Sequence, residues 1–265
     1  MAPATAKDRM GLVCQACSMD RKRVLVTGSS RGIGRAAALR LAMDGWDVAV
    51  HYAHHRSEGE NVVKLLGDHA AGLYEADLGD LAQAKALVGK VTADGRLDAL
   101  VNNAGVYITH DFLESPDSAF ATSMHRCMTV NFESPAWLVR QACKHFLTHG
   151  GGRIVNVASR VGHRGEAGAA FYSASKSALI NLTRALAVEH AEKGIAHFAI
   201  APGWVDTAMA RDGMNDRLPE ILAGIPLGRM ATPEDCAAAI NFLLRDEAAY
   251  LSGIVIDING ASYLR

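Results

Sequence analysis

The sequence VLVTGSSRGIG, residues 24–34, is the strongest indication of the fold class. Its first four residues, 24–27, are apolar or β-branched, as in a buried strand, and a glycine-rich turn follows them. Over residues 32–44 the apolar side chains recur at helical spacing, and Asp44-Gly45 ends that segment. The stretch is therefore predicted to be a strand joined directly to a helix by a turn.

Three glycines suit this turn to a phosphate group. Gly28 permits a sharp turn, Gly32 lets a phosphate approach the backbone, and Gly34 permits close packing of helix against strand. The N-terminus of the helix adds unpaired N–H groups and the positive end of its dipole. We therefore predict a dinucleotide phosphate site that also includes Ser30, Arg31 and Ile33. The alternative is an ordinary strand–helix turn without a ligand.

Strand and helix patterns alternate along the rest of the chain. Apolar runs typical of buried strands follow at 48–50, 73–76, 97–101, 153–158, 195–201 and 254–258. Helical patterns lie at 57–67, 80–93, 117–149, 171–192 and 233–245, the last with Thr232 as its cap. This alternation predicts a single α/β domain over residues 19–265, with a doubly wound Rossmann-like parallel sheet and helices on both faces.

Composition excludes several classes of protein. The 265 residues are 49% hydrophobic and carry a net charge of -1, so the chain can bury a large core and has no basic excess for nucleic acid or an anionic membrane. No apolar run reaches the ~20 residues that a membrane span requires. The five cysteines show no disulfide spacing, which favours a reducing cytoplasm.

Residues 1–18 differ from the rest because they are polar, rich in alanine and aperiodic. We predict a flexible extension, in which Cys14 and Cys17 are either two free thiols or half of a zinc site that lacks a second pair. No His, Cys and Asp residues share a metal-ligand spacing elsewhere, so no metal is expected. Most of the eleven histidines are expected at the surface, with His163 the one near the pocket.

The end of the second predicted strand bears on the choice of dinucleotide. A carboxylate usually lies there to bind the ribose 2'-hydroxyl of NAD, but the sequence from Val50 to Arg56 contains none. Arg31 is placed to bind a 2'-phosphate, helped by Arg56 or the neighbouring histidines. We therefore predict NADP(H), and the alternative is that these residues form a solvated basic edge.

Tyr172 and Lys176 are spaced to act together. Residues four apart share one face of a helix, so the phenol and the ammonium group point the same way. A nearby cation stabilises a phenolate, and we expect Lys176 to lower the pKa of Tyr172 and make it an acid/base group. A structural pair on a helix face is the alternative.

Three further features strengthen the catalytic interpretation. Ser159 ends the strand at 153–158 and offers a hydroxyl to a substrate oxygen. The segment Asn102-Asn103-Ala104-Gly105 ends the fourth strand and is expected to line the cofactor cleft. Asn131 lies in an otherwise apolar helical segment, where it either holds a water that relays protons to Lys176 or packs as a structural amide.

With these residues in order, the chain from about Arg23 to the C-terminus resembles the short-chain dehydrogenase/reductase family, most of all its 3-oxoacyl-(acyl-carrier-protein) reductases. The resemblance implies a seven-stranded sheet, with Tyr172 as general acid/base, Ser159 orienting a carbonyl, Lys176 on the nicotinamide ribose and Asn131 in a proton relay. It implies a cofactor site lined by Gly28, Ser30, Arg31, Gly32, Ile33, Gly34, Tyr52, Asp77, Leu78, Asn103, Ala104, Gly105, Tyr172, Lys176, Pro202, Gly203, Val205 and Thr207.

The expected function is NADPH-dependent reduction of a carbonyl, a 3-oxoacyl thioester or a related ketone, to an alcohol. The alternatives are an alcohol or sugar dehydrogenase that works oxidatively and a sensor that binds NADP without turnover. Ser159, Tyr172, Trp204 and Met209 are the candidate substrate contacts, and residues 204–228 are either a mobile apolar lid or an ordinary amphipathic loop and helix. Lys144 and Lys193 are candidate contacts for an acyl carrier protein, and the apolar helices at 117–149 and 174–192 imply a homodimer or homotetramer.

Overall fold

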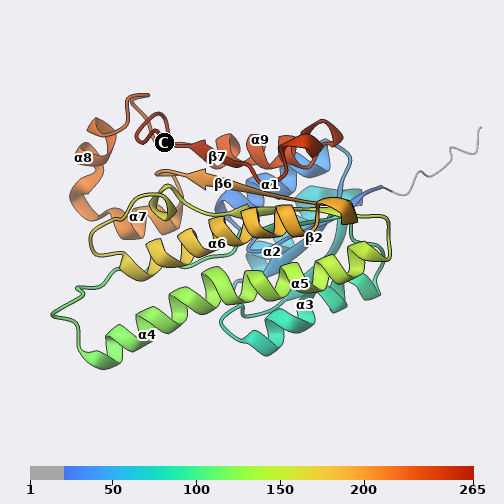
Figure 1. Cartoon of the computed structure of the whole chain (residues 1–265), viewed down its shortest axis with the longest axis horizontal. Coiled ribbons are helices and arrows are strands. Elements are labelled where there is room, and N and C mark those ends of the chain that lie inside the picture. The colour runs from blue at the N-terminus through green and yellow to red at the C-terminus, as the bar shows by residue number, and fades with distance from the viewer. Residues whose placement is uncertain (1–20) are drawn as a thin grey trace, which may run out of the picture.

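The computed structural model describes residues 21–265, apart from the side chains at positions 213 and 215 (Figure 1). The predicted extension over residues 1–18, with Cys14 and Cys17, lies outside the described residues. The described cysteines, Cys127, Cys143 and Cys236, are free and buried.

A seven-stranded sheet, parallel throughout, forms the centre of the molecule. Its strands are β1 (Arg23–Val26), β2 (Asp47–Tyr52), β3 (Ala70–Glu75), β4 (Ala99–Asn102), β5 (Gly152–Val157), β6 (Ile195–Pro202) and β7 (Val255–Ile258). Their order across the sheet is β3-β2-β1-β4-β5-β6-β7. This arrangement confirms the predicted fold class, and its strand order reverses direction beside β1, where doubly wound folds form their ligand crevice.

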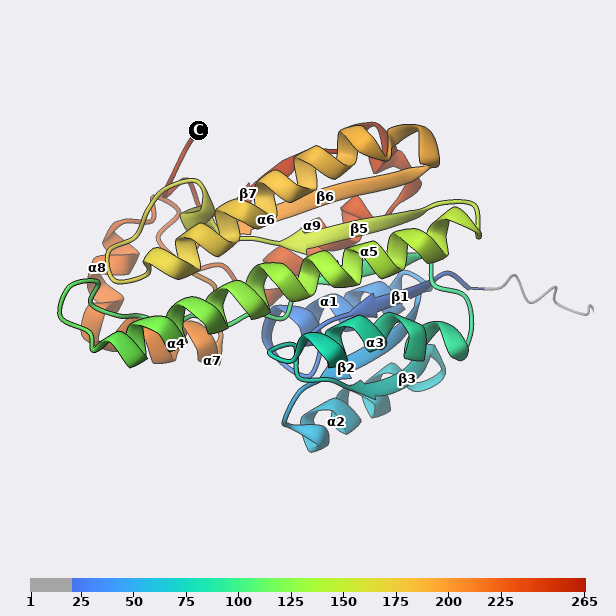
Figure 2. The same cartoon turned by 60° about the horizontal axis from the view of Figure 1, so that its bottom comes forward.

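Helices cover both faces of the sheet, as Figure 2 shows. They are α1 (Gly32–Met43), α2 (Arg56–Leu66), α3 (Leu81–Ala93), α4 (Asp117–Met128), α5 (Ser134–Leu147), α6 (Ala170–Glu189), α7 (Ala208–Met214), α8 (Leu218–Ala223) and α9 (Pro233–Leu243). Within residues 21–265, every helix falls short of the length and apolarity that crossing a bilayer requires.

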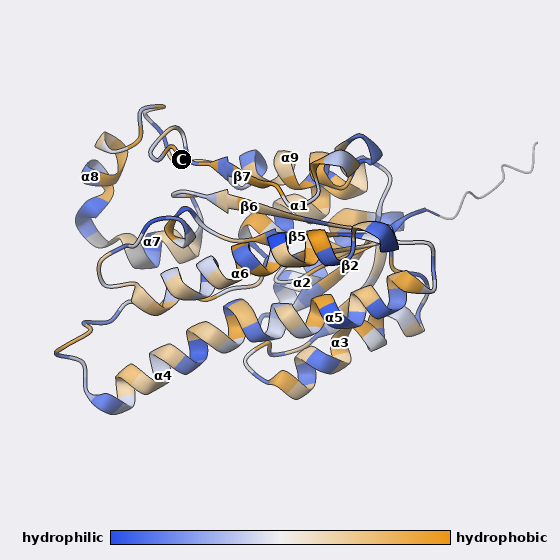
Figure 3. Ribbon diagram, in the orientation of Figure 1, coloured by the Kyte–Doolittle hydropathy of each residue, from blue (hydrophilic) through white to orange (hydrophobic). Residues whose placement is uncertain are grey.

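Burial on both faces explains why the strands are continuously apolar rather than alternating. Val24 and Val26 point into a core cluster shared with α1, α2 and α9. Leu25, between them, points into the opposite cluster, which α3 and α5 complete. The outer helices are amphipathic instead, and Figure 3 shows hydrophilic and hydrophobic residues alternating along α4 and α5.

The helical region predicted at 117–149 is not one regular helix. A π-helical turn, Thr129–Glu133, separates α4 from α5. Such turns widen a helix locally and are frequent at functional sites. Asn131 lies at the centre of this turn, so the irregularity and the isolated polar residue coincide.

The ends of the helices follow the predicted signals. Thr232 accepts a hydrogen bond from the backbone N–H of Asp235, whose side chain binds the Thr232 backbone in return, and Pro233 takes the first helical position of α9. Gly194, with φ of 67°, closes the short turn after α6. By contrast, the first turn of α1 has no side-chain cap, and its N–H groups face the carboxyl edge of the sheet.

Candidate active site

One cavity of about 830 Å³ lies at the carboxyl edge of the sheet, within the size range of small-molecule sites. Nearly all the predicted site residues line it, although they come from segments far apart in the sequence. These are Gly28, Ser30, Arg31, Gly32, Ile33, Tyr52, Asp77, Leu78, Asn103, Ala104, Gly105, Ser159, Tyr172, Lys176, Pro202, Gly203, Trp204, Val205, Thr207 and Met209. The predicted residues that do not line it are Gly34, Arg56, Asn102, Asn131 and His163.

The glycine-rich turn has the backbone that its sequence requires. Gly28 and Gly32 have φ values of 63° and 55°, in the left-handed region that favours glycine. A Cβ atom on Gly34 would collide with the carbonyl oxygen of Gly28 and the side chain of Asn103. Gly34 therefore acts in packing α1 against the turn, which explains why it does not reach the cavity.

The buried His51 side chain forms a hydrogen bond with this turn. The backbone N–H of Gly28 donates to His51 Nδ1 at 2.8 Å, so the proton of the ring lies on Nε2, which donates to the Ala76 carbonyl at 3.0 Å. Burial lowers the pKa of His51 to about 4. The residue is 1% exposed and neutral, so the expectation of a basic histidine at this strand end is wrong for His51.

Thr27 and Asn103 join β1 to β4 at the same edge. The Thr27 hydroxyl accepts hydrogen bonds from the backbone N–H groups of Asn103 and Ala104 at 2.9 and 3.0 Å. The Asn103 amide donates to the carbonyl oxygens of Thr27 and Gly28 at 2.8 and 3.2 Å. These bonds fix the floor of the cavity, and they show that Asn103 acts on the shape of the turn.

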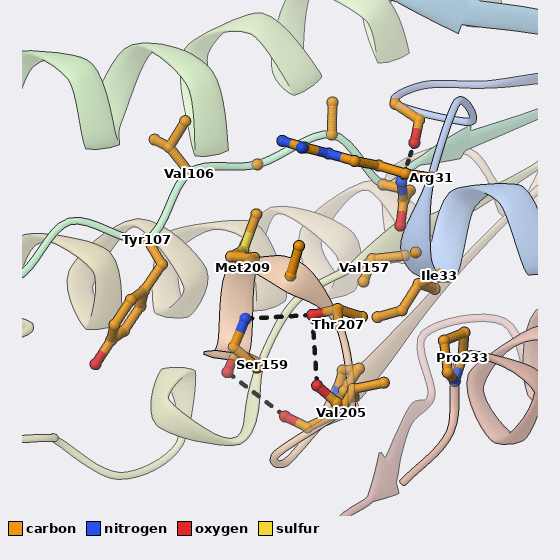
Figure 4. A pocket seen from close by; sticks show the side chains of 18 of the residues that line it. Arg31, Ile33, Val106, Tyr107, Val157, Ser159, Val205, Thr207, Met209 and Pro233 are labelled. Carbon is orange, nitrogen blue, oxygen red and sulfur yellow. Dashed lines mark hydrogen bonds between the residues drawn. The ribbon is translucent and has the colours of Figure 1, made fainter. Parts of the chain in front are cut away.

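Basic side chains surround the turn, but not all those predicted. The exposed Arg31 side chain extends along the cavity toward Val106, as Figure 4 shows. Arg35 and Arg126 also line the cavity, and neither was predicted, because each lies within a helix and outside any motif. Arg56 pairs with Glu60 at 2.8 Å and lies outside the lining, so its predicted role at a 2'-phosphate is not supported. His54 and His55 do line it.

Asp77 lies beside Arg126 at the same end of the cavity. Arg126 approaches one carboxylate oxygen at 3.4 Å, and the backbone N–H of Gly79 donates to the same oxygen at 2.8 Å. These contacts outweigh the opposing effect of burial and hold the pKa of Asp77 below its ordinary value. Asp77 is therefore an ionised hydrogen-bond acceptor at the cavity wall.

The predicted catalytic side chains come together at the other end. Tyr172 and Lys176 project from the same face of α6, with Lys176 Nζ 5.7 Å from the centre of the Tyr172 ring. Lys176 Nζ donates to the Val157 carbonyl at 2.8 Å, at the carboxyl end of β5. Ser159 is buried beside Tyr172, and its hydroxyl lies 3.5 Å from the Pro202 carbonyl.

Burial shifts the pKa values of both Tyr172 and Lys176, which their spacing in the sequence does not reveal. It raises the pKa of Tyr172 to about 12, and the hydrogen bond from Ser159 opposes this only in part. Burial lowers the pKa of Lys176 to about 8. The pKa of Tyr172 is thus raised, not lowered as expected from Lys176, because desolvation of the phenol is the largest effect and Lys176 is not among the groups that shift it. At neutral pH, Tyr172 keeps its proton.

Asn131 is a structural clamp under the site. Its Oδ1 accepts from the Val106 backbone N–H at 2.9 Å, and its Nδ2 donates to the Val106 carbonyl at 3.0 Å and to Ser175 Oγ at 3.1 Å. Asn131 is fully buried, and these bonds tie the loop after β4 to α6. The geometry thus favours the packing-amide alternative. The side chain nevertheless lies close to Lys176, because Asn131 Oδ1 and Lys176 Nζ both lie beside Gly105.

Three polar residues that the sequence did not point to lie beside Tyr172. Tyr107 packs its ring edge-on to Tyr172, with the centroids 5.0 Å apart, and its hydroxyl donates to Glu166 at 3.1 Å. Arg160 approaches the same carboxylate at 3.5 Å. Figure 4 shows Tyr107 at the end of the cavity away from Ile33 and Pro233. All three residues lie on loops or short turns without periodicity, so only the tertiary structure identifies them.

The segment predicted as a lid folds as two short helices, α7, whose first residues line the cavity, and α8, which does not line it. Trp204 and Met209 line the cavity. Met214, Ile221 and Ile225 form a small apolar cluster separate from the main core. His163 does not line the cavity and lies 3.7 Å from Asp257 instead, so its predicted place near the pocket is wrong.

Comparison with known proteins agrees with this arrangement. Residues 28–261 match the family described as Enoyl-(Acyl carrier protein) reductase. The chain is 35% identical over 247 residues to 3-oxoacyl-(acyl-carrier-protein) reductase FabG of Staphylococcus aureus, an alignment that covers 92% of this chain and 98% of that relative.

Solved structures with the same fold also match. One, from Beutenbergia cavernae with bound NADP at low occupancy, has a TM-score of 0.84 and 36% identity, and the match covers 91% of this chain and 96% of that one. Another, a blue fluorescent protein from a metagenomic library in complex with NADPH, has a TM-score of 0.81 and 32% identity, with 92% and 98% covered. From its fold, its clustered site residues and these relatives, the chain belongs to the short-chain dehydrogenase/reductase family of oxidoreductases.

Proposed function

We propose that this chain is an NADPH-dependent oxidoreductase that reduces the carbonyl group of a 3-oxoacyl thioester or a related ketone to an alcohol. The observation that carries the proposal is a single cavity that reaches from the glycine-rich turn and Arg31 to Ser159, Tyr172 and Lys176. A dinucleotide bound in it would span from a phosphate-binding helix terminus to a proton donor.

The residues present fit NADP(H). The first turn of α1 lacks a side-chain cap, so its N–H groups are free to bind a pyrophosphate. A Cβ atom on Gly32 would touch Thr207, so glycine at this position leaves room for a pyrophosphate to approach the backbone. Arg31 would bind the 2'-phosphate, and two similar structures are described with NADP or NADPH. When bound, this cofactor supplies a hydride to the carbonyl carbon.

The side chains of the chain itself supply the proton and orient the substrate. Tyr172, with its pKa raised to about 12, holds a proton at neutral pH and is suited to donate it to a carbonyl oxygen. The buried Ser159 hydroxyl is suited to hold that oxygen beside the phenol. Lys176, whose pKa is about 8, is a cation at neutral pH and is placed to bind the cofactor ribose.

The substrate class follows from the relatives and the cavity together. The FabG relative is a 3-oxoacyl-(acyl-carrier-protein) reductase, and we extend that class to this chain. Docking of an acyl carrier protein at Lys144 and Lys193 is not supported, because these residues lie near the amino ends of β5 and β6, opposite the cavity. Candidate docking residues must therefore lie around the cavity mouth.

One observation favours the second candidate, an alcohol or sugar dehydrogenase that works oxidatively. Tyr107, Glu166 and Arg160 make the wall beside Tyr172 polar, and such groups suit a substrate with additional hydroxyl groups. A sensor without turnover is the least supported alternative, because Ser159, Tyr172 and Lys176 all line the cavity.

The test is oxidation of NADPH, followed by absorbance, with a 3-oxoacyl thioester, simple ketones and keto sugars, and the reverse reaction with the matching alcohols. We expect Tyr172→Phe to lower kcat by about 10²–10⁴-fold with the preferred substrate. The control is Tyr250→Phe, at a fully exposed tyrosine. Turnover that is unchanged in Tyr172→Phe would contradict the mechanism, and no turnover in either direction with any of these classes would favour the sensor.

A further inference from the structure

Three potential metal ligands meet at the opposite end of α6 from the catalytic residues. They are Cys143 on α5, His190 at the C-terminal cap of α6 and His197 on β6. Their ligand atoms, Sγ, Nδ1 and Nε2, all lie within 4.8 Å of one another. None of the three lines the cavity described above, so the mechanism gives them no role.

Two of the three pairs of ligand atoms lie at distances close to those around one ion. His190 Nδ1 lies 3.0 Å from His197 Nε2 and 3.7 Å from Cys143 Sγ. Around a tetrahedral zinc ion, with bonds of about 2.0–2.1 Å to nitrogen and 2.3 Å to sulfur, two nitrogens lie about 3.3 Å apart and nitrogen and sulfur about 3.6 Å apart. A small change in side-chain rotamers would therefore place an ion between the three atoms.

Hydrogen bonding alone does not satisfy this cluster. A ring nitrogen carries either one proton or one lone pair, yet His190 Nδ1 faces both the His197 ring and the Cys143 thiol. In either tautomer of His190, Nδ1 can form a full hydrogen bond with only one of these two neighbours, and the other is left unsatisfied. His197 is fully buried, and its Nδ1 has no partner among the described residues, so the polar groups here are costly to bury.

We propose that Cys143, His190 and His197 bind a zinc ion. The ligand set, one thiolate and two imidazoles, is of the kind that zinc prefers. The thiol of Cys143 loses its proton to solvent when the sulfur–metal bond forms, and both imidazoles bind through neutral nitrogens. Within residues 21–265, no fourth His, Cys, Asp or Glu joins the group, which leaves the remaining position for water.

The surroundings suit this site. The Glu189 carboxylate lies 3.5 Å from His190 Nε2, on the side of the ring away from the cluster, as a carboxylate behind a histidine ligand does. The His190 side chain is 13% exposed, which gives an ion a path from solvent.

The site would tie α5, the end of α6 and β6 together without touching the catalytic cavity. We therefore expect bound zinc to raise the Tm by several degrees and to leave kcat with the preferred carbonyl substrate unchanged within about twofold. This separates the inference from the proposed function, because metal binding is measured without substrate or cofactor.

The test uses the full chain without a polyhistidine tag, with Cys14 and Cys17 replaced by serine because they are a second thiol pair. The protein is stripped with a chelator and titrated with Co²⁺, which reports thiolate ligation by a charge-transfer absorption band, and then with Zn²⁺. We expect one Co²⁺ per chain, displacement by Zn²⁺, and loss of the band in Cys143→Ser. The matched control is Cys236→Ser, at another fully buried thiol, which should keep the band.

His190→Gln is the second variant, because His190 is only partly buried and its replacement is less disruptive to folding. Circular dichroism checks the fold of each variant, and His190→Gln should bind Co²⁺ at least about tenfold more weakly. The proposal is overturned if the chain lacking Cys14 and Cys17 shows no thiolate band. It is also overturned if Cys143→Ser and His190→Gln bind as the parent does, or if Cys236→Ser loses the band equally.

Discussion

Arg31 offers the sharpest test of cofactor choice, through the change Arg31→Ala. Its guanidinium is exposed, lines the cavity and has no ion pair among the described residues, so it is free to bind a 2'-phosphate. A hydrogen bond to a charged group contributes about 1.5–3 kcal/mol. Since about 1.4 kcal/mol is a tenfold change, the variant should lose about 10–150-fold in kcat/KM for NADPH.

The same change should leave kcat/KM for NADH almost unaltered, because NADH has no 2'-phosphate. Initial rates with each cofactor, at one fixed concentration of the preferred carbonyl substrate, measure both values. Arg40→Ala is the matched control, because that exposed arginine lies in the last turn of α1 and does not line the cavity. Equal losses with NADPH and NADH, or a loss with NADPH of less than about threefold, would refute the reasoning.

Further predictions concern protonation, packing and assembly. The folded chain resists protonation of His51 down to a pKa of about 4 while the unfolded chain takes up that proton near 6.5, so stability should fall as pH drops through this window. Urea unfolding at several pH values should show a loss of about 3 kcal/mol from this group, and a smaller slope in His51→Gln. Because the pKa of Lys176 is about 8, kcat/KM should decline as pH rises through 8, and a profile flat to pH 10 would contradict this. Asn131→Ala leaves the backbone of the loop after β4 unpaired, and should lower the free energy of unfolding by about 1–3 kcal/mol in urea melts. The apolar helical segments at 117–149 and 174–192, on which Met124, Leu147 and Val188 are exposed, predict a homodimer or homotetramer, and a monomer in light scattering would exclude both.

The sequence predicted the fold because its signals are local. A buried strand, a glycine-rich turn and an amphipathic helix each depend on residues close together in the chain. The continuous apolar strands required helices on both faces, and the structure has them. Their spacing of four residues also places Tyr172 and Lys176 on one face of a helix without any tertiary information.

Properties that depend on surroundings were decided only by the tertiary structure. The pKa of Tyr172 depends on desolvation, and burial of the phenol raises that pKa although Lys176 lies on the same helix face. From the sequence, His51 was predicted to be a basic residue together with two other histidines. In the structure it is buried and neutral, and it accepts a hydrogen bond from the glycine-rich turn.

The same holds for groups gathered from distant segments. Glu166 reaches Tyr107 across 59 positions, and His197 meets Cys143 across 54, with no shared motif in the sequence. Local propensity and period determined the strands, the helices and the phosphate-binding turn. Burial and long-range contact determined protonation, the polar wall beside Tyr172 and the cluster of Cys143, His190 and His197, because these depend on neighbours that only the folded chain brings together.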